Sequence, residues 1–286
     1  MNILFIGSSG VLSLTPFYKL LSSADLIVAV AVYKPIQFQD KIIALENESL
    51  ALAATKAKIP VTDLSLALPE LIEQISELSI DVIIMSCYSR RLPDVIIKLA
   101  NKGCYNMHPS LLPRYRGPEP IFWQMKYADK TGVSWHKVIH ELDAGDIALQ
   151  KEVFLDDGLS YSEISLFLAE TGADLMLKLL SGIASDSQTF MPQNTDNASY
   201  YNYPESSDFV IDNRYSAQQI YNFMRATRAF SRPYLFQFDN YRFTLDAALD
   251  YDNNRCLETV EMQGNRLYIP CNEGVLIATY TDKIPI

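Results

Sequence analysis

Residues 2–33 read NILFIGSSGVLSLTPFYKLLSSADLIVAVAVY, and this stretch decides the fold class. The apolar run over residues 2–6 predicts a buried strand, a turn at residues 7–10 leads into a helix, and residues 26–33 predict a second buried strand. The alternation continues with helices expected over 50–58 and 68–78 and strands over 59–61 and 81–87. Because these strands are apolar on both faces, they indicate a parallel sheet that is covered by helices on both sides.

The fold that we predict is therefore α/β, with a Rossmann-like, mostly parallel sheet that binds its ligands at the carboxyl ends of the strands. Residues 131–155 predict extended segments around the polar turn DAGD at 143–146. Ser160 followed by Glu163 is typical of a helix start, and this helix is expected to run to about residue 180. Its apolar face is expected to hold Ile164, Phe167, Leu168, Leu175 and Leu179.

The chain divides by composition into a first domain over residues 1–183, a polar linker over 184–204 and a second domain over 205–286. The second domain combines a helix over 217–228 with several short strands, which favours a small, β-rich, OB-like barrel. The linker region contains an aromatic cluster that either stacks on a base or packs at the domain junction: Tyr200, Tyr201 and Tyr203.

The composition excludes several classes of protein. A chain of 286 residues with 49% hydrophobic residues is not disordered, and it has no apolar run of about 18 residues to span a membrane. Its start lacks the basic lead-in of a signal peptide, and its four cysteines have no metal or disulfide spacing, so we expect a cytoplasmic protein. The net charge of −10 disfavours an attraction of the whole surface to polyphosphate.

Two short motifs are the candidates for chemistry. Asn106 and His108 are two residues apart at a strand end, so both point to the same side, where they can stabilise an oxyanion and move a proton. The alternative is a hydrogen-bonded cap of the strand. The DAGD turn supplies a carboxylate, Asp143, that can orient an imidazole or relay a proton through water, although such a sequence is also ordinary turn chemistry.

Two other uses of these motifs are disfavoured. His136 and His140 are four residues apart, but no Glu follows the first His and the segment is expected to be a strand, so we predict no metal site. The GSSG turn at residues 7–10 lacks the Gly-x-Gly-x-x-Gly spacing and the acidic residue of a dinucleotide fingerprint, and it does not predict NAD.

The stretch NMHPSLLPRYRG at 106–117, with LDAGDI at 142–147, resembles the signature of the 10-formyltetrahydrofolate-dependent formyltransferases. The pair of motifs is far more specific than either alone. Residues 203–205 and 220–226 are similar to the second-domain entry of methionyl-tRNA formyltransferase and of the aminoarabinose formyltransferase of lipid A modification, so the resemblance covers nearly the whole chain.

The resemblance implies a catalytic triad of Asn106, His108 and Asp143. In this family an amine attacks the formyl carbon of 10-formyltetrahydrofolate and forms a tetrahedral oxyanion. Asn106 and protonated His108 would stabilise the oxyanion, and neutral His108 or a water held by Asp143 would take the proton of the amine. No metal is implied.

The resemblance also implies two sets of binding residues. Folate is expected to lie against a strand end and a loop, chiefly on backbone groups, at Met85, Cys87, Tyr88, Arg90, Leu92, His140, Glu141 and Leu142. The acceptor is expected at Ser110, Arg114, Arg116, Gly117 and Glu119. The two arginines can hold a diphosphate, and Glu119 either recognises the ammonium group of the acceptor or caps a turn.

The resemblance leaves the acceptor open. Glycinamide ribonucleotide transformylases lack such a second domain, and deformylases carry an amino-terminal regulatory domain that we do not find here. Three observations disfavour tRNA: the net charge, eleven acidic residues against eight Lys and Arg over residues 201–286, and few basic residues in the loop at 33–41. We therefore favour a nucleotide-linked amino sugar, with methionyl-tRNA as the alternative, a non-catalytic folate-binding protein as a further one, and a homodimer as a hypothesis.

Overall fold

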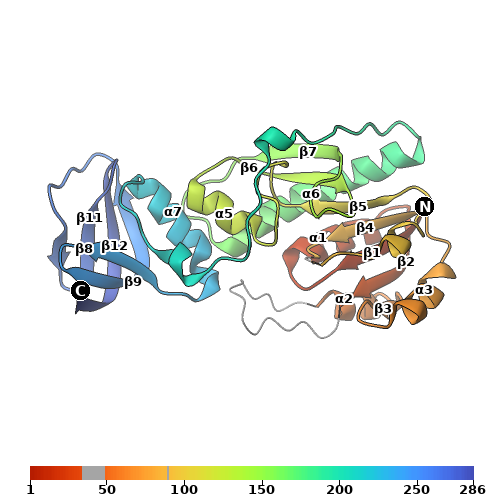
Figure 1. Ribbon diagram of the computed structural model, residues 1–286, viewed down its shortest axis with the longest axis horizontal. Helices are drawn as coiled ribbons and strands as arrows, with labels where there is room; N and C mark the ends of the chain where they lie inside the picture. The colour runs from red at the N-terminus through yellow and green to blue at the C-terminus, as the bar shows by residue number, and fades with distance from the viewer. Residues whose placement is uncertain (34–48, 89) are drawn as a thin grey trace.

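The computed structural model describes residues 1–33, 49–88 and 90–286 (Figure 1). Its larger sheet has seven strands in the order β3-β2-β1-β4-β5-β6-β7. Strands β1 to β5 are parallel, whereas β6 and β7 run antiparallel to their neighbours. The strands are β1 (Asn2–Gly7), β2 (Leu26–Val32), β3 (Val61–Asp63), β4 (Val82–Ser86), β5 (Cys104–His108), β6 (Thr131–Lys137) and β7 (Ile147–Val153).

Helices cover both faces of this sheet because its strands are apolar on both sides. Ile3 and Phe5 of β1 join one hydrophobic cluster, and Leu4 and Ile6 join another. The first cluster is covered by α1 (Val11–Leu21), α2 (Leu50–Lys56) and α6 (Tyr161–Ala184), and the second by α3 (Leu68–Ser76) and α4 (Asp94–Ile97). The predicted α/β class is confirmed. The third strand, expected over 59–61, lies instead at β3, where it pairs with the end of β2.

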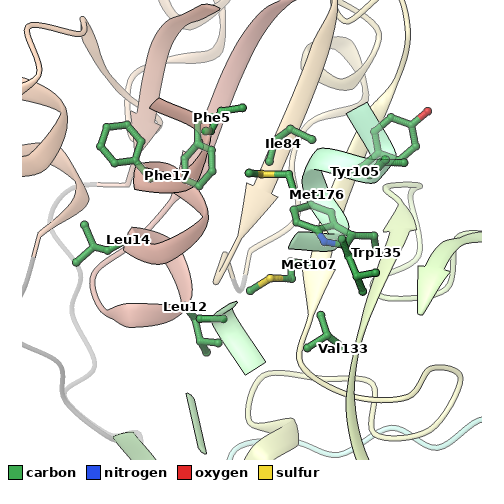
Figure 2. Packing of buried hydrophobic residues seen from close by; sticks show 14 of the residues in the cluster. Phe5, Leu12, Leu14, Phe17, Ile84, Tyr105, Met107, Val133, Trp135 and Met176 are labelled. Carbon is green, nitrogen blue, oxygen red and sulfur yellow. The ribbon is translucent and has the colours of Figure 1, made fainter. Parts of the chain in front are cut away.

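Helix α6 begins as predicted, with a capping box between Ser160 and Glu163. Gly172 in its middle faces the sheet so closely that a Cβ there would lie 2.1 Å from the Met107 sulfur. Trp135 also donates its indole N–H to the Gly172 carbonyl at 2.8 Å, and Figure 2 shows Met107, Trp135 and Val133 gathered on this face of the sheet. Packing therefore explains the glycine. The placement of Phe167 on the buried face is wrong, because its side chain lies beside the buried stripe and is 46% exposed.

The carboxyl-terminal part contains a helix and a five-stranded antiparallel sheet in the order β10-β11-β12-β9-β8. Its apolar core extends into the first part, because Phe122 of α5 (Pro120–Tyr127) contacts Phe209, Phe223 and Phe230 with ring centroids 5.3–5.4 Å away. The elements are α7 (Ala217–Thr227), β8 (Tyr234–Phe238), β9 (Tyr241–Asp252), β10 (Glu261–Gln263), β11 (Arg266–Pro270) and β12 (Val275–Pro285).

The segment between α6 and α7 returns along the edge of the larger sheet (Figure 1). Met191 exchanges two backbone hydrogen bonds with Ile147 of β7, and Tyr201 donates its backbone N–H to the Arg116 carbonyl. The Tyr201 ring stacks on Trp123, with centroids 4.8 Å apart, so this member of the tyrosine cluster packs at the junction. Short 3₁₀ turns occupy Thr195–Asn197, Ser206–Phe209 and Arg228–Phe230.

Within residues 1–33, 49–88 and 90–286, none of the helices combines the length and the apolar character needed to cross a bilayer. The loop at 33–41, whose few basic residues disfavour tRNA as the acceptor, lies outside the described residues from residue 34 onward.

Candidate active site

The carboxyl end of β5 brings Asn106 and His108 to the same region as the loop that follows β6. Both side chains are buried, with 9% and 4% of the residue exposed. Antiparallel pairing of β5 with β6 places His136 directly opposite Asn106. The loop between β6 and β7 then carries Asp143 to within 3.6 Å of both imidazoles.

The tautomer of His108 follows from its hydrogen bond. Its Nε2 lies 2.7 Å from the Tyr115 carbonyl oxygen, which can only accept, so Nε2 carries the proton. In the neutral ring Nδ1 then has a free lone pair, and it lies 3.6 Å from Oδ1 of Asp143. Burial lowers the pKa of His108, and the Asp143 charge and the Tyr115 carbonyl oppose this shift only in part. His108 is therefore a neutral base at pH 7.

Asp143 is the ionised partner of this base. Burial would raise its pKa, but the attraction between the carboxylate and the protonated forms of His108 and His136, together with the Gly117 amide, holds the pKa of the carboxyl group well below its usual range. The Gly117 N–H donates to Oδ2 at 2.9 Å. The backbone of Asp143 is left-handed, with φ of 55°, and two other residues of the region, Cys87 and Tyr115, share this strained conformation.

Asn106 is oriented by His136. The His136 Nδ1 lies 2.8 Å from the Lys137 carbonyl oxygen and therefore carries the proton, so its Nε2 accepts from Nδ2 of Asn106 at 3.2 Å. Oδ1 of Asn106 is then buried without a hydrogen-bond partner, and the second amide hydrogen is directed away from His136. A buried polar group in this state fits a ligand that completes its hydrogen bonds.

Arg116 is the cation that the structure brings to this site. Its guanidinium donates through Nε and Nη2 to Oε1 of Gln193, at 3.2 and 2.8 Å, and its Nη1 lies 3.7 Å from Glu141. Arg114 points elsewhere, because it forms an ion pair with Asp129 and is half exposed. The two arginines thus do not act as a pair.

Ser110 and Glu119 lie in the surrounding structure. Ser110 is fully buried, donates to the Arg114 carbonyl at 2.7 Å and accepts from Ser134 at its own carbonyl, so it holds the loop after β5. Glu119 precedes α5 but makes no capping hydrogen bond with its side chain; its Oε2 accepts instead from the Tyr161 hydroxyl at 3.1 Å.

The stretch at the end of β4 contains both buried and exposed side chains. Met85 and Leu92 are 3% and 2% exposed and belong to the core, so their side chains are not available to a ligand. Burial raises the pKa of Tyr88 to about 12, although the neighbouring Arg90 opposes the shift. The Arg90 guanidinium lies 3.7 Å from the centroid of the Tyr33 ring.

The loop before Asp143 is exposed. Glu141 has 74% of its side chain exposed and Leu142 is 37% exposed. The His140 Nδ1 lies 3.7 Å from Asp94, and its Nε2 lies 3.2 Å from Arg91, so its exposed side chain contacts residues that follow β4. Among the described residues no group of three or more His, Cys, Asp and Glu side chains is arranged to hold a metal ion.

Sequence reasoning missed two residues of this site. The spacing of His136 and His140 points only to a possible metal ligand, because the position of His136 opposite Asn106 depends on a strand register that no local pattern encodes. Gln193 lies in a polar segment and gave no signal at all.

Comparison with known proteins links the chain to one family. A family model described as formyl transferase matches residues 1–180. The chain is 32% identical over 175 residues to a methionyl-tRNA formyltransferase of Thermotoga maritima, covering 60% of this chain and 56% of that protein. It is 31% identical over 284 residues to the methionyl-tRNA formyltransferase of Ehrlichia chaffeensis, covering 97% of this chain and 90% of that protein. The chain thus spans little more than half the length of the Thermotoga relative.

Solved structures share the fold over the full length. An N-formyltransferase from Helicobacter canadensis, in complex with folinic acid and dTDP-3-aminofucose, matches with a TM-score of 0.68 and 18% identity, covering 98% of this chain and 99% of that one. WlaRD, a sugar 3N-formyltransferase with dTDP and 5-N-formyl-THF, matches with a TM-score of 0.65 and 18% identity, covering 99% of each chain.

Proposed function

Because the chain belongs to the formyl transferase family, as the resemblance of its motifs implied, we propose that it transfers a formyl group from 10-formyltetrahydrofolate to a primary amine. The observation that carries this proposal is the convergence of Asn106, His108 and Asp143 at the end of β5. The amide N–H donor of Asn106, the neutral imidazole of His108 and the ionised carboxylate of Asp143 are the groups that an acyl transfer needs.

In the proposed reaction the amine nitrogen attacks the formyl carbon, and the new C–N bond leaves a negative charge on the formyl oxygen. The free amide hydrogen of Asn106 donates to this oxyanion. His108 takes the ammonium proton at Nδ1, and Asp143, 3.6 Å away, stabilises the imidazolium that forms. The bond to the folate nitrogen then breaks, that nitrogen is protonated from His108, and tetrahydrofolate leaves.

The folate site is proposed at the strand end and loop that flank the triad. Residues 85–88 and 90–92 include two buried side chains, those of Met85 and Leu92, and Glu141 and Leu142 are exposed on the loop before Asp143. This arrangement suits a flat pteridine that pairs with backbone atoms. The two structural relatives were solved with folinic acid and with 5-N-formyl-THF, which supports the assignment.

The acceptor that we propose is a nucleotide-linked amino sugar. A single buried guanidinium, that of Arg116, stands beside the triad and suits the diphosphate of such a molecule better than an extended polyanion. The −10 net charge opposes tRNA, and two arginines of the carboxyl-terminal part, Arg214 and Arg255, are already paired with Asp212 and Glu261. We place the reaction in the cytoplasm, because all four cysteines are free thiols.

Methionyl-tRNA is the second candidate. It is favoured by the sequence relatives, since the Thermotoga and Ehrlichia proteins that exceed 30% identity are methionyl-tRNA formyltransferases. A local basic groove on an acidic protein would be needed for this acceptor.

The test is the release of tetrahydrofolate from 10-formyltetrahydrofolate with two acceptors in parallel: a dTDP-linked 4-amino-4,6-dideoxyhexose and charged initiator tRNA. His108→Ala serves as the blank. Turnover with the sugar alone supports the proposed acceptor, and turnover with tRNA alone replaces it by the second candidate. Formyl transfer by the His108→Ala blank at the wild-type rate would contradict the proposed base.

A further inference from the structure

Gln193 uses its whole hydrogen-bonding capacity on groups at the site. Its Nε2 donates to the carbonyl oxygens of Asp143 and Gly145, both at 2.8 Å. Its Oε1 accepts from Nε and Nη2 of Arg116, at 3.2 and 2.8 Å. A single side chain from the segment after α6 therefore joins the loop of the catalytic carboxylate to the buried guanidinium.

Each half of this contact fixes one partner. The two hydrogen bonds to Oε1 of Gln193 set the plane of the Arg116 guanidinium, and because this side chain is only 9% exposed, little water is available to replace a lost partner. On the other half, the two carbonyls flank the turn in which Asp143 has its left-handed backbone. Gly145 in this turn approaches β6 so closely that a Cβ would lie 2.0 Å from the Lys137 carbonyl oxygen.

Other contacts already hold the segment that carries Gln193. Met191 exchanges backbone hydrogen bonds with Ile147 at 2.8 and 2.9 Å. Further along the segment, the backbone of Ser199 and Tyr201 bonds to the backbone of the loop at residues 113–116. Because these bonds do not involve the Gln193 side chain, its removal is expected to leave the path of the segment unchanged. The Gln193 side chain is therefore not needed to hold this segment in place.

We propose that Gln193 is a positioning residue, which holds the Arg116 guanidinium toward the phosphate of the acceptor and aligns the Asp143 loop with His108. This inference rests on the proposed function, since it assumes an anionic acceptor. Gln193 itself contacts neither reacting atom, and it acts through Arg116 and Asp143.

The first experiment compares Gln193→Ala with Gln188→Ala. Gln188 lies in the same segment and likewise donates to a backbone carbonyl, that of Ala148 at 2.9 Å, but away from the triad. We expect Gln193→Ala to raise the acceptor KM at least tenfold and to leave the folate KM within twofold of the wild-type value. Gln188→Ala should change neither parameter. Equal effects of the two variants would overturn the proposal.

Gln193→Glu separates the two halves of the contact. The glutamate can still accept hydrogen bonds from Arg116. It cannot donate to the carbonyls of Asp143 and Gly145, and it places a carboxylate against them. We expect kcat to fall at least tenfold, with a smaller rise of the acceptor KM than in Gln193→Ala. A larger KM effect in the Glu variant would contradict this division of roles.

A double-mutant cycle with Arg116→Ala tests whether Gln193 acts through Arg116. In the Arg116→Ala background, Gln193→Ala should raise the acceptor KM less than threefold, whereas multiplicative effects would overturn the proposal. The cycle uses whichever acceptor the wild type turns over. If it turns over neither, the proposed function fails, and a crystal structure of Gln193→Ala decides separately: an unmoved Arg116 guanidinium and Asp143 turn would contradict the positioning role.

Discussion

His108 and Asp143 face each other across 3.6 Å, from Nδ1 to Oδ1, while the opposite nitrogen of the imidazole is held by the Tyr115 carbonyl. The ring therefore cannot turn without losing a bond at 2.7 Å. The nitrogen that receives a proton is fixed, and the carboxylate that stabilises this proton is in place before a substrate arrives. Such preorganisation is the main source of electrostatic catalysis.

Asp143→Asn should lower kcat by about 10²–10⁴-fold, because the imidazolium loses its stabilising charge. It should also move the acid limb of the kcat/KM profile to lower pH, since the Asp143 charge raises the pKa of His108. A pH series of initial rates measures both effects. Asp146→Asn, in the same turn, is the matched control and should leave the limb in place; a limb that moves to higher pH in Asp143→Asn would contradict the assignment.

Asn106→Ala should reduce kcat by about 10²–10³-fold, the usual effect of losing one oxyanion donor. The folate KM should change little, because the folate site is proposed on backbone groups elsewhere. Steady-state kinetics with varied folate separate these effects. Asn101→Ala, at an exposed turn before β5, should behave as the wild type. A rise in the folate KM with unchanged kcat would assign Asn106 to binding instead.

Gly117→Ala should destabilise the fold by about 3 kcal/mol or more and abolish activity. Gly117 has φ of 109°, and a Cβ there would lie 2.0 Å from the Tyr201 carbonyl oxygen. A shift of the backbone at residue 117 would also remove the hydrogen bond that its N–H donates to the Asp143 carboxylate. Gly264→Ala is the control, because φ is also positive but nothing lies within 4 Å, and only about 1–2 kcal/mol is expected. Urea unfolding measures both, and equal losses would refute the steric argument.

The stability of the protein should fall as the pH drops below about 6.5, in part because His108 is buried in its neutral form. Its folded pKa is lowered, so the unfolded chain binds the proton first, and the contribution is complete above pH 6.5 and is lost as the pH falls through the folded pKa. Melting temperatures from pH 8 to pH 5 test this. His108→Gln should flatten the slope, whereas His140→Gln, with an exposed side chain, should not.

Gly172→Ala should destabilise the protein by about 1–3 kcal/mol through overpacking against the Met107 sulfur. Gly182→Ala, in the same helix, meets only the flexible end of Gln188 at 2.9 Å and should be neutral or stabilise by up to about 1 kcal/mol. Thermal unfolding of the two variants gives the comparison. A stabilised Gly172→Ala variant would show that the helix is not pressed against β5 and β6.

The sequence predicts the sheet and its helices well, because strands buried on both faces leave runs such as residues 26–33 that have few other uses. It also predicts Asn106, His108 and Asp143 as site residues, since two local motifs carry them. It could not place His136 opposite Asn106, because strand register is a tertiary property. Arg114 and Arg116 look equivalent in sequence, and the structure separates them because Arg114 pairs with Asp129 whereas Arg116 is buried against Gln193.

The path of residues 185–204 along the catalytic sheet bears on how members of such a family can be recombined. Gln193 and Tyr201 bond to the loops that carry Asp143 and Arg116, so this connection belongs to the site although it follows the last helix of the sheet. A chimera of two relatives joined inside the connection would separate these side chains from their carbonyl partners. Functional crossover points are therefore expected after residue 204, and exchange of the carboxyl-terminal unit alone should leave the formyl-transfer chemistry intact.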